Sequence, residues 1–423
     1  MTRNEFAATI TGLGGKAYLV GGSVRDSFMH KIPKDHDYSI TGITEQAFVS
    51  IFPQAKRVGV SFPVYLLDVD NETSEVAFAR KEWKSGMGYH GFAFEVDPRV
   101  TIEEDLARRD TTMNAIAIDL TTGRTIDPFN GRRDIKAGIV RAINEHFCDD
   151  PTRALRAARQ AAQHQATIHP YTRQLMEKCA SELAQEPTER ILNELKLALA
   201  SPRPSVFFTQ MPEPLLKVAF PEIHALIGKT QPIQHHPEGD AFNHTMIVLD
   251  KAAAKSDDPK VRFCALYHDI GKGTTPTNVL PHHYGHERRG IEVIEEVDKR
   301  MVLPRDWKEA AQFVSKYHMV VKVVEHPGTI VKILFELDKA PITTKGFKVV
   351  CAADSKTNFN PLWLKCADDF IAVLKSQVRG VNAPSHLHGP QVGEWIHNRR
   401  SHLFKHLFKR LLKVGPHAFD PYR

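Results

Sequence analysis

The sequence contains few cysteines and no long hydrophobic run. Its five cysteines are scattered along 423 residues and never stand in a CxxC pair, which argues against a disulfide framework and against a structural zinc site. No segment approaches the roughly 18 consecutive apolar residues that a transmembrane helix needs. The first 15 residues lack the apolar core of a signal peptide. We therefore expect a protein of the reducing cytoplasm with no membrane partner.

Internal repeats and low-complexity segments are also missing from the sequence. The length suggests two to four domains at roughly 100–200 residues each. A composition of 42% apolar and 25% charged residues is that of an ordinary globular protein. The net charge of +6 is compatible with a nucleic-acid partner but does not require one. Many of the 22 histidines crowd into 235–326, which indicates either metal chemistry or ordinary polar surface.

The sequence pattern changes near Cys148 from strand-like to helical. Before this point, short β-type runs alternate with turns at 17–20, 37–40, 63–67 and 75–79. After it, segments rich in Ala, Arg, Leu and Glu have helical periodicity. We therefore predict an α+β protein, with a small mixed α/β head followed by all-helical parts. The expected domains are a head at 1–140, a neck and body at 141–225, a histidine-rich helical domain at 226–360 and a helical tail at 361–423.

The segment GGSVRD at 21–26 has the features of a phosphate-binding turn between a strand and a helix. Gly21 and Gly22 let the backbone approach a ligand closely, and the helix N-terminus that follows offers N–H groups to an anion. Arg25 can add a bidentate contact to phosphate. A tight strand–helix turn capped by Ser23 explains the same residues equally well.

Paired carboxylates follow at Asp35 and Asp37. Because residues two apart on a strand point to the same face, these carboxylates are expected to project together. They repel each other unless a cation neutralises them, and Mg²⁺ takes carboxylate oxygens together with substrate phosphates. Metals held this way can activate a hydroxyl group and stabilise leaving pyrophosphate. Glu75 opens a strand-like run and is the candidate for a third acid, with a plain surface position as the alternative.

Arginines gather in two further segments. RRDTTMNA at 108–115 places Arg109 beside an acid, which suits contacts to a triphosphate or sugar, although a salt-bridged helix start is the alternative. From Asp150 onward the sequence has the features of a helix N-terminus. Three arginines spaced three apart share a face of this helix, which either is solvated or binds RNA: Arg153, Arg156 and Arg159. Asp150 and Arg153 together could supply the acceptor and the fork of donors that mimic a Watson–Crick partner.

The chain at roughly 17–200 resembles the class II CCA-adding enzymes and bacterial poly(A) polymerases in the order of its motifs: GGSVRD, DHD, RRDTTMNAIAI, IDPFNG, DDPTRALRAAR and TERILNEL. These enzymes belong to the DNA polymerase beta-like nucleotidyltransferase superfamily. The resemblance implies that Asp35 and Asp37 bind catalytic Mg²⁺, and that Asp150 and Arg153 select C or A by pairing with the base, without a nucleic-acid template. It also implies contacts to the incoming nucleotide from Gly22, Arg25, Arg109, Arg156 and Arg159, with Gly21 in the same turn.

The histidine-rich region carries a second resemblance. His244 stands about one helix before ALYHDIGKG at 265–273, and this pattern resembles the HD phosphohydrolase superfamily. The resemblance implies a metal site formed by His244, His268, Asp269 and the late ligand Asp354. Imidazole and carboxylate suit several divalent transition metals, with Ni²⁺ as one candidate, and a bound water could be activated to attack phosphate. His286 and His318 are candidates for lining the pocket, and surface positions explain them as well.

An HD domain behind a class II head marks the multifunctional bacterial CCA proteins. The resemblance therefore implies addition of CCA to tRNA from CTP and ATP, together with phosphatase and 2′,3′-cyclic phosphodiesterase activities. One alternative is a poly(A) polymerase, or a partial enzyme that adds only CC or only A. Another is a metal phosphohydrolase whose head only binds RNA, against which the intact Asp35 and Asp37 argue. The expected partners are tRNA, CTP and ATP, and the expected assembly is a monomer or a weak homo-oligomer.

Two further segments carry weaker signals. The segment 80–103, which contains Gly86, Gly88 and Gly91, resembles the flexible loop that these enzymes use when switching from C to A, and a plain mobile loop also explains it. The run at 397–413 places apolar residues on one helix face, largely opposite its Lys and Arg residues: Leu403, Phe404, Leu407, Phe408, Leu411 and Leu412. We predict a helix packed on the body, with RNA contact as the alternative.

Overall fold

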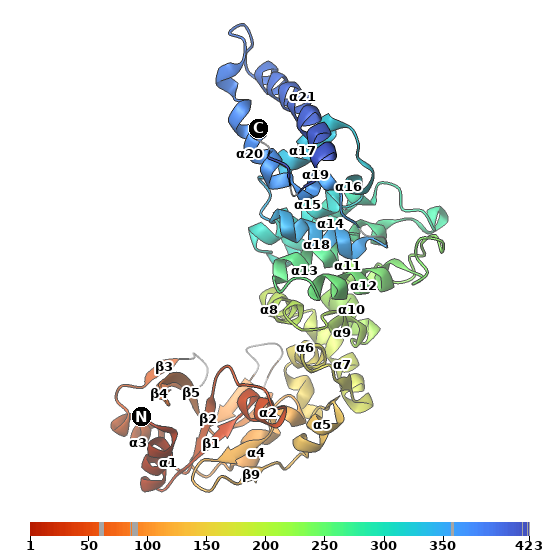
Figure 1. Ribbon diagram of the computed structural model, residues 1–423. Helices are drawn as coiled ribbons and strands as arrows, with labels where there is room; N and C mark the ends of the chain where they lie inside the picture. The colour runs from red at the N-terminus through yellow and green to blue at the C-terminus, as the bar shows by residue number, and fades with distance from the viewer. Residues whose placement is uncertain are drawn as a thin grey trace. The chain divides into compact units, whose positions relative to one another are not determined.

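The computed structural model describes residues 1–58, 63–84, 86, 92–356, 359–416, 418–420 and 422. The chain divides into two compact units, Met1–Ala219 and Phe220–Arg423 (Figure 1). The first unit holds a β-sheet with helices, and the described part of the second is helical, which confirms the predicted α+β class. The predicted domain boundaries at 140 and 360 subdivide these units further and stay predictions. All five cysteines are described and free, and no described helix is long and apolar enough to cross a membrane.

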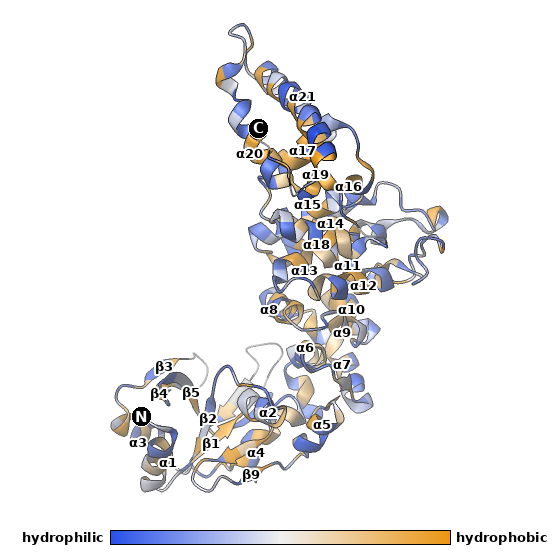
Figure 2. Cartoon of the chain, viewed as in Figure 1, coloured by the Kyte–Doolittle hydropathy of each residue, from blue (hydrophilic) through white to orange (hydrophobic). Residues whose placement is uncertain are grey.

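A seven-stranded sheet forms the centre of the first unit, in the order β3–β4–β5–β2–β1–β8–β9. Its strands are β1 (Lys16–Val20), β2 (Asp37–Thr41), β3 (Lys56–Val58), β4 (Val64–Val69), β5 (Glu72–Phe78), β8 (Ala117–Asp119) and β9 (Thr125–Ile126). Strands β2 and β5 are parallel, and the other neighbouring pairs are antiparallel. The four runs that the sequence predicted as strands overlap β1, β2, β4 and β5. Figure 2 shows the apolar residues on the central strands.

The alternation of side chains along β1 supplies two hydrophobic cores, one on each face of the sheet. Leu19 packs with residues of α1 (Arg3–Gly12) and α3 (Glu45–Ile51), whereas Tyr18 and Val20 pack with α4 (Ile102–Ala107). Helix α1 precedes the first strand of the sheet. It begins with a capping box between Thr2 and Glu5 and covers the sheet with buried apolar side chains.

The remaining elements of the first unit surround the sheet or continue the chain beyond it. Strands β6 (Lys81–Lys84) and β7 (Phe92–Glu95) form an antiparallel pair, and β10 (Ile139–Val140) pairs in parallel with β11 (Thr167–Ile168). Gly88 and Gly91 lie outside the described residues, so the loop prediction stays a prediction. The helices are α2 (Gly22–Phe28), η1 (Thr112–Asn114), α5 (Gly131–Ala137), η2 (Glu145–Asp149), α6 (Thr152–His164), α7 (Pro170–Leu183), α8 (Thr188–Leu199), α9 (Ser205–Thr209) and α10 (Glu213–Ala219).

Helices make up the described secondary structure of the second unit. They are α11 (Pro221–His224), α12 (Ala241–Ala253), α13 (Pro259–Tyr267), η3 (Ile270–Thr274), η4 (Thr277–Val279), α14 (His286–Met301), α15 (Arg305–Tyr317), α16 (Val320–Val323), α17 (Pro327–Leu337), α18 (Thr344–Asp354), α19 (Leu362–Lys365), α20 (Ala367–Gln377), η5 (Gly380–Asn382) and α21 (Pro390–Val414). Helix α13 packs against α12, α15 and α18. These helices bring the histidine-rich segments together.

Helix α21 contains the predicted C-terminal helix and packs against α17 and α20. Phe404, Leu407 and Leu411 are buried in that contact. Leu412 was predicted on the same face, but its side chain is 61% exposed. The prediction was wrong for this residue because its position in the helical period places it beyond the edge of the packed stripe.

Candidate active sites

Three carboxylates come together at one edge of the head sheet. Asp37 opens β2, and the parallel register of β2 and β5 places Glu75 directly opposite it. Asp35 precedes β2 and is exposed. Burial raises the pKa of Asp37 to about 6, the negative charges of Asp35 and Glu75 add to this shift, and Arg109 opposes it. The sequence named all three acids, and the fold brings them into one electrostatic cluster.

The chemistry of this cluster fits a divalent cation with oxygen ligands. Mg²⁺ prefers carboxylate oxygens and keeps positions for substrate phosphates and water. The mutual repulsion that raises the pKa of Asp37 is the kind that a bound cation relieves. Asp35, Asp37 and Glu75 are therefore the residues of the head that could hold Mg²⁺.

A polar cavity of about 580 Å³ opens beside these acids. Asp37 and Glu75 line it, whereas Asp35 does not belong to its wall. All eight residues predicted to bind the nucleotide line the same cavity: Gly21, Gly22, Arg25, Arg109, Asp150, Arg153, Arg156 and Arg159. The structure thus gathers residues from distant parts of the first unit around one space.

Gly21 lies in the wall of this cavity, in a backbone conformation that favours glycine. Its φ of +75° lies in the left-handed region that favours glycine. A Cβ atom there would lie 3.3 Å from Nη1 of Arg109 and 3.4 Å from Oδ2 of Asp37. Glycine therefore keeps open the space between the arginine and the metal-type carboxylate.

Buried acids hold the arginines of the cavity wall in place. Arg156 forms an ion pair with Asp110 at 2.8 Å, and Nε of Arg159 donates to Glu194 at 2.6 Å. Burial alone would raise the pKa of Asp110, but the positive charges of Arg156 and Arg153 and the hydrogen bond from Asn114 together outweigh it and hold the pKa well below the ordinary range. These acids fix the guanidinium groups before any ligand arrives, which is the arrangement that binding of an anionic ligand requires.

Arg109 retains a donor for a ligand. Its Nη2 donates to Asp105 at 3.3 Å, while its Nε is buried and makes no hydrogen bond with the described residues. A buried unpaired donor is costly unless a ligand or water satisfies it. This orphaned atom on the cavity wall fits a site that accepts phosphate oxygens.

The two residues predicted to read the base both line the cavity, but each has other partners. Oδ2 of Asp150 accepts a hydrogen bond from Nη2 of Arg190 at 2.9 Å, and its Oδ1 accepts from the hydroxyl of Thr152 at 2.7 Å. Nη1 of Arg153 donates to the carbonyl of His146 at 2.8 Å. The two side chains are thus positioned separately, by different partners.

Sequence reasoning missed several residues of this site. Arg190 lies in the motif TERILNEL, so the sequence contained a signal for it. Glu82, which lies in the segment 80–103, and Gln160 also line the cavity, although the sequence assigned neither residue a role in the site. They reach the site through folding alone.

A second cluster lies in the other unit and contains the four predicted metal ligands. Ligand atoms of His244, His268, Asp269 and Asp354 all lie within 4.8 Å of one another. Nε2 of His244 is 3.0 Å from Asp354 and 3.5 Å from Asp269, and Nε2 of His268 is 3.2 Å from Asp269. Helices α12, α13 and α18 or their ends carry these residues, so their packing assembles the cluster.

The histidines of this cluster are oriented by hydrogen bonds at their other ring nitrogen. Nδ1 of His268 donates to the carbonyl of Ala265 at 2.7 Å, and Nδ1 of His244 contacts the carboxylate of Glu238 at 2.7 Å. Because Nδ1 carries the proton in such contacts, Nε2 is left as a lone-pair donor for a metal. Nε2 of His268 is also buried without a hydrogen bond to the described residues, which fits a metal ligand.

His286 and His318 adjoin the cluster through Asp269. Their Nε2 atoms lie 3.1 Å and 3.2 Å from Oδ1 of Asp269, and their Nδ1 atoms donate to backbone carbonyls. The three residues could hold a second cation that shares Asp269 with the first group. The sequence had left these histidines open between pocket and surface, and both are buried.

Two lysines complete the electrostatics of the cluster. Nζ of Lys272 lies 2.6 Å from Oδ2 of Asp269, and Nζ of Lys322 lies 2.5 Å from Oδ2 of Asp354. A buried ammonium group beside metal-type ligands can also contact phosphate oxygens of a substrate. The set of imidazoles, carboxylates and lysines can therefore bind a divalent transition metal and a phosphate ester together.

Family models match three segments of the chain. Residues 17–141 match the poly A polymerase head domain, residues 167–227 match the probable RNA and SrmB-binding site of polymerase A, and residues 241–356 match the HD domain. The chain is 41% identical over 356 residues to the multifunctional CCA protein of Mannheimia succiniciproducens, covering 81% of this chain and 84% of that protein. It is 37% identical over 408 residues to that of Thioalkalivibrio sulfidiphilus, covering 93% and 98%.

Solved structures show the same fold at lower sequence identity. A CCA-adding enzyme in an apo form superposes with a TM-score of 0.67 at 19% identity, covering 94% of this chain and 91% of that chain. The Bacillus stearothermophilus CCA-adding enzyme in complex with CTP gives a TM-score of 0.66 at 22% identity, covering 95% and 92%. At these identities the structures establish the fold alone.

Proposed function

The chain belongs to the family of multifunctional CCA proteins and is a CCA-adding tRNA nucleotidyltransferase with an HD domain, and from this premise we propose how its two sites divide the chemistry. The head cavity transfers nucleotides from CTP and ATP to the 3′ end of tRNA. The second cluster, formed by His244, His268, Asp269 and Asp354 and here termed the HD cluster, hydrolyses phosphate esters with a divalent metal. Because the substrate of the protein is tRNA, we propose a cytoplasmic location.

The observation that carries the first assignment is the juxtaposition of Asp37 and Glu75 at the mouth of an arginine-lined cavity. Mg²⁺ would supply charge neutralisation and activation of the 3′-hydroxyl of the RNA. Asp35, Asp37 and Glu75 would hold it. Gly21 leaves room for the triphosphate beside Arg109.

The arginines then bind and orient the nucleotide. Arg25 and Arg109 are assigned to the triphosphate because they flank the glycine turn and the carboxylates. Arg156 and Arg159 are assigned to nucleotide contacts on the wall formed by α6, with Gly22 at the start of α2. Phosphoryl transfer depends mainly on positioning and charge stabilisation. Guanidinium groups that are held in place before the nucleotide binds therefore favour the reaction.

Asp150 and Arg153 are assigned to base selection. A carboxylate accepts hydrogen bonds from the amino group that C and A share, and a guanidinium donates to ring acceptors. U and G lack an amino group at that position of the pairing edge, so an oriented carboxylate disfavours them. Selection needs no template because both partners of the base belong to the protein.

The HD cluster supports phosphatase and 2′,3′-cyclic phosphodiesterase chemistry as the second activity. Its oriented imidazoles and buried carboxylates fit a divalent transition metal such as Ni²⁺, which would supply an activated water. Lys272 can contact the phosphate from beside Asp269. Hydrolysis of 2′,3′-cyclic AMP by the full-length protein, lost on chelation and restored by added Ni²⁺ or another divalent metal, tests this assignment. No hydrolysis with any metal would overturn it.

The test of the main activity is extension of three tRNA transcripts that end before the first C, after CC and after CCA. Each is incubated with CTP alone, ATP alone or both. We expect the first transcript to gain CCA and stop, the second to gain A, and the third to gain nothing. A long tail with ATP alone would indicate a poly(A) polymerase, and a halt at CC would indicate a partial enzyme. Failure of all additions would favour a hydrolase with an RNA-binding head.

A further inference from the structure

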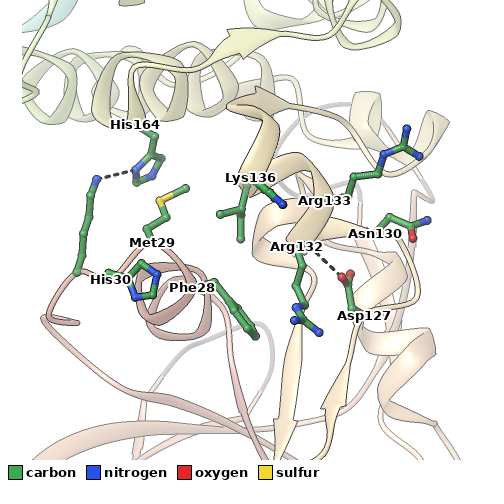
Figure 3. A pocket seen from close by; sticks show the side chains of 11 residues that line it. Phe28, Met29, His30, Asp127, Asn130, Arg132, Arg133, Lys136 and His164 are labelled. Carbon is green, nitrogen blue, oxygen red and sulfur yellow. Dashed lines mark hydrogen bonds between the residues drawn. The ribbon is translucent and has the colours of Figure 1, made fainter.

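A basic pocket lies on the head, separate from the nucleotide cavity. It has a volume of about 890 Å³, and its basic wall consists of His30, Lys31, Arg132, Arg133, Lys136 and His164. Figure 3 shows His30 and His164 on one side of the space, with Arg132 and Lys136 from α5 on the other. These residues lie outside the segment that matches an RNA-binding region, 167–227. They also take no part in the two sites assigned above.

The positive charge of this pocket is largely uncompensated. Among the described residues, Lys31, Arg132 and Lys136 form no ion pair with a carboxylate, and all three side chains are exposed. Asp127 also lines the pocket, but its carboxylate accepts backbone hydrogen bonds from Gly131 and Arg132 at the start of α5. The acid of α5 itself, Asp134, is buried and paired with Arg141. An anionic ligand would therefore meet several unbalanced cations.

His164 adds an uncharged donor to these cations. Its Nδ1 lies 3.3 Å from Nζ of Lys31 and accepts from that ammonium group, which leaves the proton on Nε2. Burial lowers its pKa to about 3, and the charges of Arg25, Lys31 and Arg159 add to the shift. Burial, with the nearby positive charges, thus keeps this imidazole neutral. Nε2 is buried without a hydrogen bond to the described residues.

Two helices connect the basic pocket to the nucleotide cavity. Helix α2 begins at the cavity with Gly22 and Arg25, and its end leads into the pocket at Phe28. Helix α6 contributes Arg156 to the cavity and His164 to the pocket, and these positions, eight residues apart, are separated by roughly 12 Å at the usual helical rise. The RNA strand that receives a nucleotide must enter the cavity with its 3′ end, so its preceding phosphates lie at about this range.

We propose that the basic pocket binds backbone phosphates of the tRNA 3′ strand just upstream of the nucleotide that is being extended. This inference rests on the proposed nucleotide transfer in the head cavity and names a part of the tRNA-binding surface for it. Contacts of Lys and Arg with phosphate carry no sequence information, which suits a strand whose register shifts with each addition. The pocket holds the acceptor strand while Asp150 and Arg153 select the base.

The test measures binding of full-length protein to a fluorescent tRNA transcript that ends after CC, without CTP or ATP. The variant is Lys31→Ala/Arg132→Ala/Lys136→Ala. The matched control, Lys16→Ala/Lys56→Ala/Arg124→Ala, removes three exposed cations elsewhere on the head. We expect the pocket variant to raise Kd by roughly tenfold or more and to lower the slope of log K against log salt by about 2. The control is expected to change Kd less than about twofold.

A second probe separates the 3′ strand from the rest of the tRNA. The same transcript trimmed back to its last base pair should bind the pocket variant and the control with equal affinity. Equal loss of affinity on the trimmed and untrimmed transcripts would overturn the assignment to the 3′ strand, and no loss on either would overturn RNA binding by the pocket. CTP binding without tRNA should stay at the wild-type value, which shows that the variant is folded. Wild-type protein that binds the transcript but does not extend it would contradict the proposed function instead.

Discussion

The two candidate sites organise charge in opposite ways. In the head, carboxylates from neighbouring strands and arginines from surrounding helices face an open cavity of about 580 Å³. In the HD cluster, the ligand residues are packed between helices, with His268 at 0% and Asp269 at 1% exposure. A site through which charged nucleotides pass must stay accessible to water. A site for a resident metal can be enclosed, because its ligands need to be exposed only to the ion and a small ester group.

The same contrast appears in what orients each side chain. Acids hold arginines of the head wall, such as Asp110 for Arg156, so the free edge of the guanidinium group is directed at a mobile anion. Each histidine of the HD cluster is fixed at Nδ1 by an acceptor, so its Nε2 is directed at a cation. Ion pairs therefore prepare one site for negative ligands, and hydrogen bonds to imidazole prepare the other for positive ones. We therefore expect that a substitution that inactivates one site leaves the other site active.

The largest expected effect comes from Asp37→Ala. Removal of this carboxylate takes away the acid that lies opposite Glu75 in the sheet register, and with it the site proposed for Mg²⁺. Loss of metal stabilisation of the transition state costs several kcal/mol, so we expect single-turnover C addition to fall by roughly 10³-fold or more. Hydrolysis of 2′,3′-cyclic AMP should remain within about twofold of wild type.

The reciprocal variant, His268→Ala, serves as the control for Asp37→Ala. It should abolish hydrolysis and metal retention while C addition continues at the wild-type rate. If C addition persists in Asp37→Ala, the carboxylate cluster is not the catalytic metal site. If both activities fall in either variant, the sites are coupled and the comparison above is incorrect.

The next effect, a loss of metal affinity, is expected for Glu238→Ala. Glu238 contacts Nδ1 of both His244 and His236, and its carboxylate makes His244 a better and better-oriented ligand. Loss of such an outer contact typically lowers metal affinity by roughly 10–100-fold. Calorimetric titration of Ni²⁺ into metal-free protein measures this directly, without reference to activity.

His236→Ala is the matched control for Glu238→Ala. His236, Glu238 and His244 could by themselves form an alternative metal group. If the ion lies in the cluster with His268 and Asp269, His236→Ala leaves Ni²⁺ affinity nearly unchanged. An equal loss of affinity in both variants would place the ion at the alternative group instead.

Glu238 also illustrates which parts of the molecule the sequence could not predict. The HD ligands were predictable because His244 and ALYHDIGKG stand in a recognisable order. Glu238 lies in a loop before α12 without periodicity or motif, and only its contact with His244 reveals its role. The residues of the basic pocket were missed for a similar reason: they come from three separate segments, at 30–31, 132–136 and 164.

In the head, the sequence predicted individual strands but not how these strands pair. Alternating apolar residues predicted β1, β2, β4 and β5, and the resemblance identified the family, both of which the structure and comparisons confirm. The sequence did not contain the parallel pairing that places Glu75 beside Asp37, because two other strands, β3 and β4, separate them along the chain. Pairing across such a separation depends on the packing of the whole sheet. The roles of the site residues stay predictions until the variants are measured.

A smaller effect is expected from Arg190→Ala, which tests how the head orients its base-reading acid. Nη2 of Arg190 donates to Asp150 at 2.9 Å, and its Nη1 donates to Glu186 at 2.5 Å. A charge-assisted hydrogen bond is worth about 1.5–3 kcal/mol. Without it the carboxylate of Asp150 keeps only its contacts with Thr152 among the described residues, so we expect the preference for CTP over UTP to fall by roughly tenfold. The ratio of kcat/KM values for single additions of the two nucleotides measures this.

Two further variants serve as positive and negative controls for Arg190→Ala: Asp150→Ala and Arg173→Ala. Asp150→Ala removes the acceptor itself and should lower the CTP preference at least as much, whereas Arg173, on α7, contacts the carbonyl of Gln210 and should leave the preference unchanged. An unchanged ratio in Arg190→Ala combined with a large loss in Asp150→Ala would show that the acid is held by Thr152 alone. In that case the contact with Thr152 would be sufficient to orient Asp150, as local hydrogen bonds orient the histidines of the HD cluster. A loss in both variants would confirm that the open site depends on an arginine from a separate helix to position the acid that reads the base.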